Sequence, residues 1–112
     1  MKKLSVLSLL FFLPVALAAF TGEIIKTYDL PSTCPTGLTY DGQNLWLADR
    51  KTDQLYCLDK NDGKVVRQLP APGYWPMGLA WDGKALWVSD LRDGKIYQVD
   101  PKSGFVIKTI DA

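Results

Sequence analysis

The chain has 112 residues, with 13 Lys+Arg against 12 Asp+Glu and no histidine. Without histidine there is no imidazole general base and no imidazole metal ligand, which excludes many hydrolase mechanisms. The balanced charge, with no run of like charges, argues against a nucleic-acid-binding surface.

The N-terminus has the pattern of a secretory signal peptide. Lys2 and Lys3 form a short basic region, residues 4–17 are apolar, and the small-residue pattern Ala16-Leu17-Ala18 follows. The apolar run is shorter than the roughly 20 residues that a spanning helix needs. We therefore predict a signal peptide over 1–18, a secreted or periplasmic protein, and no membrane span after cleavage; an uncleaved anchoring helix is the alternative.

Residues 19–112 are enough for one small domain. Cys34 and Cys57 are the only cysteines, and an exported protein with an even number of cysteines permits a disulfide. Both lie in the first of two repeat units, and Trp75 and Gln98 occupy the equivalent positions in the second unit. The sequence leaves open whether Cys34 and Cys57 are bonded or are two free thiols.

An internal repeat of 41 residues dominates the chain. Residues 22–71 laid over 63–112 give 15 identities in 50 pairs, where about three would follow from average composition. The two units cover about 31–71 and 72–112, and an extra segment at 22–30 precedes them.

The sequence pattern of each unit predicts four short strands. In the first unit they are 37–40, 44–48, 54–58 and 64–69, separated by Asp41-Gly42, by 50–53 and by 61–63, which are turn sequences. A repeat of about 40 residues with four strands is typical of a β-propeller blade. The second strand of each unit is largely apolar on both faces, as expected for a blade covered on both sides.

Two phrases carry a family resemblance. Residues 78–90, GLAWDGKALWVSD, and 95–104, KIYQVDPKSG, resemble blades of bacterial extracytoplasmic β-propeller proteins of the broad NHL-like, YVTN-like and streptogramin-lyase-like group. The resemblance implies an all-β fold of two four-stranded blades. It also implies that a ligand would meet the loops between outer and inner strands and between second and third strands.

The sequence departs from the enzymes of this group at their functional residues, which favours a non-catalytic protein over an enzyme. Streptogramin lyases depend on histidine, which this chain lacks. Gluconolactonase-type propellers bind a divalent metal through a glutamate and other side chains, and the single glutamate, Glu23, lies outside the expected loops. We predict no catalytic residue, no metal site and no cofactor.

The extra segment makes nine strands where two blades need eight. Residues 22–27 align with 63–68, an outer strand, so we expect 22–30 to form an additional outer strand. Closed propellers need at least four blades. Either identical chains assemble, three of them giving six blades, or the chain is part of a longer propeller, or it is a two-blade monomer.

Four residues in the expected ligand-facing loops are not repeated: Tyr74, Trp75, Arg50 and Arg92. Aromatic rings beside arginines can stack on a sugar or hold an anionic ligand; the alternative is that Tyr74 and Trp75 cover the junction between blades. Asp49 and Asp90 are repeated, which predicts carboxylates that accept backbone N–H bonds in a turn. A ring of metal ligands is their alternative.

The sequence thus predicts an exported non-catalytic binding or protein-interaction module that self-associates or binds a partner protein. A small molecule or glycan is the expected ligand at the four unrepeated residues. The alternative function is a fragment or protomer of a lactonase-like or lyase-like propeller enzyme.

Overall fold

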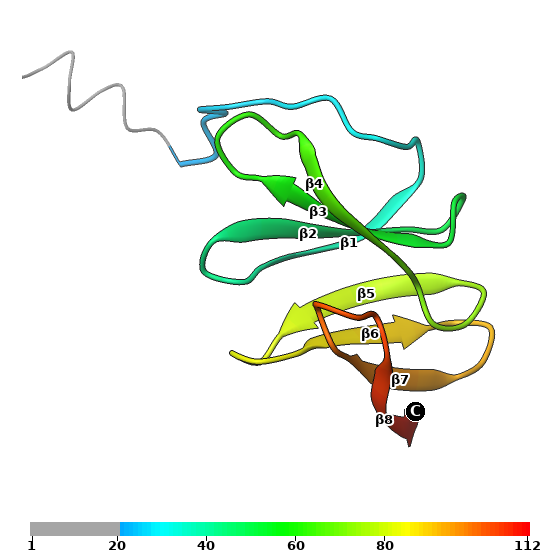
Figure 1. The fold of residues 1–112 in the computed structure, drawn as a ribbon. Coiled ribbons are helices and arrows are strands. Elements are labelled where there is room, and N and C mark those ends of the chain that lie inside the picture. The colour runs from blue at the N-terminus through cyan, green and yellow to red at the C-terminus, as the bar shows by residue number, and fades with distance from the viewer. Residues whose placement is uncertain (1–20) are drawn as a thin grey trace, which may run out of the picture.

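The computed structural model describes residues 21–112, so the predicted signal peptide lies outside the described part of the chain. Two four-stranded antiparallel sheets, each in sequential strand order, make up the fold (Figure 1). The first sheet contains β1 (Pro35–Tyr40), β2 (Asn44–Asp49), β3 (Gln54–Asp59) and β4 (Val65–Pro70). The second sheet contains β5 (Pro76–Trp81), β6 (Leu86–Asp90), β7 (Lys95–Val99) and β8 (Val106–Asp111). The predicted all-β class with two four-stranded units is confirmed.

The same turn opens both sheets. Asp41 Oδ1 accepts the backbone N–H groups of Gln43 and Asn44, at 2.8 and 2.7 Å. Gly42 has φ 93°, a conformation that side chains with a Cβ rarely adopt. The other carboxylate oxygen of Asp41 accepts the indole N–H of Trp46 at 2.8 Å, so one aspartate fixes both the turn and the first large side chain of β2.

The two sheets meet most closely at their inner strands. A Cβ added to Gly37 of β1 would lie 2.9 Å from the backbone nitrogen of Leu79 in β5. Thr36 Oγ1 donates to the carbonyl of Pro76 at 2.7 Å, which links the two strands directly. Only a residue without a side chain permits this approach, which explains the glycine at 37.

One face of the first sheet packs on one face of the second to form the main core. Alternate residues of each strand point to the same face, so Trp46 and Ala48 of β2 lie with Leu55 and Cys57 of β3. The core residues that they contact from the second sheet are Leu86, Val88 and Val99. The opposite face of the first sheet forms a smaller cluster of Leu47, Tyr56 and Leu58.

The expected additional strand at 22–30 is not formed. Residues 23–30 have no strand assignment, although Tyr28 and Leu30 lie over the face of the first sheet that points away from the second. The physical reason is that each sheet already has its own outer strand, β4 or β8, and 22–30 meets no free β3-type edge with which to pair. Among the described residues, no helix has the length and apolar character needed to cross a membrane.

Candidate functional site

The two repeated aspartates at the ends of β2 and β6 hold loops together. Asp49 accepts the backbone N–H of Cys34 with Oδ2, and those of Lys51 and Thr52 with Oδ1, at 2.9 to 3.2 Å. Burial raises the pKa of Asp49, but hydrogen bonds from Thr52, Ser32 and Cys34 outweigh it, and the pKa is lowered overall. The geometry is that of the predicted structural carboxylate.

Asp90 holds the equivalent loops of the second sheet. Its Oδ2 accepts the backbone N–H of Trp75 at 2.6 Å, and its Oδ1 accepts that of Asp93 at 2.8 Å. The carboxylate also lies against Gly73, whose φ is 79° and where a Cβ would have no room. Gly73 and Asp90 therefore fix the backbone of the segment that carries Tyr74 and Trp75. No group of three or more residues suited to a metal occurs within 21–112.

The structure brings the four unrepeated loop residues together in two pairs. The Arg50 guanidinium lies 4.7 Å from the centre of the Trp75 ring, and that of Arg92 lies 5.3 Å from the centre of the Tyr74 ring. Arg50 comes from the β2–β3 loop, Arg92 from the β6–β7 loop, and both rings from the connection between the sheets. Two arginines from different sheets thus flank one Tyr-Trp pair.

This arrangement is open to solvent. Tyr74 is 66% exposed and Trp75 is 36% exposed, so neither ring is buried at the junction between the sheets. The prediction that these rings only cover the junction therefore does not account for Tyr74. Cation–π contacts hold each guanidinium over a ring and leave its N–H donors free to point outward.

A second tyrosine supports the same end of the second sheet. Tyr97 donates its hydroxyl proton to Asp93 Oδ2 at 2.9 Å. Burial, together with this bond to a carboxylate, raises the pKa of Tyr97 to about 12. In the first sheet the equivalent pair is Tyr56 and Thr52, which share a neutral bond of 3.0 Å. The tyrosine of the second sheet therefore bonds to a carboxylate, whereas that of the first sheet bonds to a neutral hydroxyl.

The disulfide that the sequence left open is not formed, and Cys34 and Cys57 are both free. Cys34 lies beside Arg50, whose backbone N–H donates to the Cys34 carbonyl. Cys57 lies in β3, on the side of β2 opposite to Cys34. It is paired with Trp46, which lies four residues before Arg50. At about 3.3 Å per residue along a strand and about 4.8 Å between strands, their Cα atoms lie beyond the roughly 7 Å limit of a disulfide.

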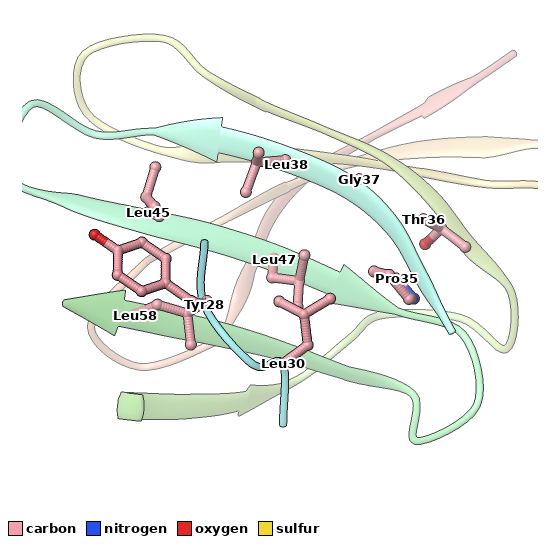
Figure 2. A pocket seen from close by; sticks show the side chains of 9 residues that line it. All are labelled: Tyr28, Leu30, Pro35, Thr36, Gly37, Leu38, Leu45, Leu47 and Leu58. Carbon is pink, nitrogen blue, oxygen red and sulfur yellow. The ribbon is translucent and has the colours of Figure 1, made fainter. Parts of the chain in front are cut away.

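An apolar pocket of about 430 Å³ lies on the outer side of the first sheet (Figure 2). Tyr28 and Leu30 form one side of it, and Leu38, Leu45, Leu47 and Leu58 lie opposite. Sequence reasoning missed this pocket because it assigned 22–30 to a sheet. The signal in the sequence is that Leu45, Leu47 and Leu58 alternate along their strands with residues of the main core. They therefore form a second apolar face on the opposite side of the sheet.

Comparison with known proteins places the fold. No protein-family model and no curated protein matches the sequence. Among solved structures, glutaminyl cyclase from Myxococcus xanthus aligns with a TM-score of 0.68 at 16% identity, over 82% of this chain and 39% of that one. Virginiamycin B lyase from Staphylococcus aureus aligns with a TM-score of 0.62 at 18% identity, over 82% and 32%. BamB from Moraxella catarrhalis aligns with a TM-score of 0.60 at 19% identity, over 83% and 29%.

These neighbours are β-propeller proteins. The two sheets have the fold of β-propeller blades. The chain spans less than two fifths of the length of each of the three neighbours. At these identities the likeness concerns the fold of the blades, and propellers of one fold carry unrelated activities.

Proposed function

We propose that the protein is an exported, non-catalytic binding module whose ligand site is the end of the two blades at Arg50, Trp75, Tyr74 and Arg92. The observation that carries this proposal is the pair of arginine–aromatic contacts, at 4.7 and 5.3 Å, on one exposed connection between the sheets. Residues without a repeat counterpart are not needed to build a blade, and here they gather at one place.

The chemistry of this site favours an anionic ligand. Each ring already has a guanidinium on one face, and that guanidinium keeps donors for a carboxylate or sulfate. The exposed side of Tyr74 offers a surface on which a sugar ring can stack. Lys51, whose Nζ lies 3.4 Å from Thr33 Oγ1, adds a third positive charge at this end of the first sheet. An acidic sugar, with one ring and one carboxylate, matches both features.

The rigidity of the site supports binding over a loose surface contact. Asp90 fixes the backbone of Trp75, and Asp49 fixes the loop that begins at Arg50. A preorganised site loses less conformational entropy when a ligand binds. We further propose that the module works in association with other blades, supplied by further copies of the chain or by a longer propeller, because both outward faces of the pair of sheets carry exposed apolar residues.

The test is a calorimetric titration with glucuronate, with glucose as the neutral counterpart. We expect glucuronate to bind, and Arg50→Ala and Arg92→Ala each to weaken binding on the order of tenfold, since each removes a charge-assisted contact. Higher salt should weaken binding to the unaltered protein.

Arg67→Ala is the matched control. Arg67 is an exposed arginine of β4, far from this end of the sheets, and donates to the Pro101 carbonyl at 2.8 Å. Equal loss of affinity in Arg67→Ala and Arg92→Ala would show that only net charge matters. Binding of glucose as strong as that of glucuronate would contradict the role of the arginines.

A further inference from the structure

The outward face of each sheet carries, at equivalent repeat positions, the same kinds of residues as the interface between the two sheets. The face of the first sheet that packs on the second contains Trp46, Ala48 and Leu55; the residues 41 positions later, Trp87, Ser89 and Ile96, lie on the open side of the second sheet and line a shallow pocket there. We call this the open face of the second sheet.

The other outward face is complementary to it. The face of the second sheet that meets the first contains Leu79, Leu86, Val88 and Val99. Its equivalents, Leu38, Leu45, Leu47 and Leu58, line the outer side of the first sheet, where Leu38 is 61% exposed. We call this the open face of the first sheet. The two open faces therefore have the composition and spacing of an interface that already exists within the chain.

Residues 22–30 lie on the open face of the first sheet in the place of a missing outer strand. A Cβ added to Gly63 would lie 2.6 Å from the Tyr28 ring; at the equivalent Gly104 it would lie 3.5 Å from Leu69 of β4. Tyr28 and Leu69 are themselves 41 residues apart, so Tyr28 contacts the first sheet as β4 contacts the second. Its hydroxyl also donates to the Lys60 carbonyl.

The sequence of this segment is that of β8 rather than of β4. Residues 22–30, GEIIKTYDL, share five of nine positions with 104–112, GFVIKTIDA, and only the glycine with 63–71, GKVVRQLPA. Asp29 corresponds to Asp111, whose carboxylate pairs with Lys95 of β7. Residues 22–30 thus resemble the strand that pairs with β7, but they lie on the first sheet, away from β7 of the same chain.

We propose that residues 22–30 of one copy of the chain pair with β7 of a second copy, in the position of that copy's β8, while the open face of its second sheet packs on the open face of the first sheet. The occupant of both faces is a second copy of this chain. This proposal rests on the proposed self-association and specifies how it is made.

The exchange keeps the hydrogen bonds and adds burial. The β7–β8 register pairs Lys95 with Asp111 and Gln98 with Lys108, and Asp29 and Lys26 present the same side chains in the same order. All six residues of β8 are exposed, so its release uncovers little that is buried. Ile24 and Ile25, 80% and 93% exposed, would become part of a sheet.

The test is a cross-link in the full chain with Cys34 and Cys57 replaced by alanine. One variant carries Asp29→Cys and another carries Lys95→Cys. After mild oxidation of the mixture we expect a covalent dimer on a non-reducing gel, because exchange places residue 29 of one copy opposite residue 95 of the other. Lys95→Cys with Asp111→Cys in one chain is the matched control, because its internal bond holds β8 on β7; once oxidised, this locked chain should no longer associate.

Light scattering on the same samples separates the two proposals. Associated protein in which residues 29 and 95 do not cross-link would overturn strand exchange while leaving self-association intact. Protein that stays monomeric at all concentrations would overturn both. A locked Lys95→Cys/Asp111→Cys chain that associates as strongly as the reduced chain would also overturn strand exchange, since β8 then keeps its place on β7.

Discussion

Trp46 and Trp87 occupy equivalent positions in the two sheets and differ only in what covers them. Their indole N–H groups donate to Asp41 and Asp82 at 2.8 and 2.7 Å, so the local structure around the two rings is the same. Trp46 is 1% exposed, however, whereas Trp87 is half-buried on the open face of the second sheet. The sequence of a blade therefore determines its local structure, and the neighbouring blade determines how much of its surface is buried.

The largest expected effect tests this difference directly. Trp46→Ala removes a buried ring from the main core and should destabilise the protein by about 3–5 kcal/mol. Trp87→Ala removes a half-buried ring with the same hydrogen bond, and should cost about 1–2 kcal/mol. Urea unfolding of both variants at low protein concentration, followed by circular dichroism, gives the two values.

The outcome also bears on association. If the cost of Trp87→Ala rises with protein concentration, the ring is covered by a second copy, because folding is then linked to association. Equal costs for the two variants at every concentration would contradict the difference in burial between the two sheets.

The repeat explains why the fold could be predicted from the sequence. The glycines at 42 and 83, the aspartates before them and the apolar second strands each specify a local feature, and all eight strands lie at the expected places. Residues 22–30 look like an outer strand by the same reasoning and do not form one. A strand requires a partner edge, and that depends on the rest of the assembly rather than on the segment itself.

The candidate site was predictable only in part. Absence from the repeat singled out Arg50, Arg92, Tyr74 and Trp75, but which arginine faces which ring depends on how the two sheets are placed relative to each other. The state of Cys34 and Cys57 depends on the same kind of three-dimensional information. The pocket beside Tyr28 depends on the position of a segment that local sequence patterns assign to a strand.

Acid sensitivity should reveal the shared turn of the two sheets. Bonds from the backbone N–H of Ala85, the indole of Trp87 and the N–H of Lys84 lower the pKa of Asp82 to about 2. A carboxylate with a lowered pKa in the folded state adds stability above its unfolded pKa of about 3.9 and loses it as the pH falls toward 2. Asp82→Asn should therefore flatten the loss of stability between pH 4 and 2, measured by acid titration of the circular dichroism signal.

Asp41 provides the comparison for that titration. Burial raises its pKa, but the bonds from Asn44, Trp46 and Gln43 outweigh it, so its pKa is also lowered and Asp41→Asn should flatten the same pH range. An unchanged slope in Asp82→Asn would show that the carboxylate does not hold the turn through its charge.

The smallest expected effect concerns a position with positive φ, which an aspartate occupies in the first sheet and a glycine occupies in the second. Asp53 has φ 54°, and Gly94, its equivalent, has φ 63°. Within the described residues, Asp53 Oδ1 is buried and has no hydrogen-bond partner. Asp53→Gly removes both the strained backbone and the unpaired oxygen, and keeps the carbonyl that accepts the Ala71 N–H.

These gains exceed the extra entropy that glycine gives the unfolded chain, so Asp53→Gly should stabilise the protein by about 1 kcal/mol. The measurement is the shift of the urea midpoint at constant slope. The reciprocal change, Gly94→Asp, brings the same strain into the second sheet and should destabilise it by a similar amount. If both substitutions destabilise the protein, the Asp53 carboxylate is hydrogen-bonded in solution, to a water molecule or a cation at this end of the first sheet.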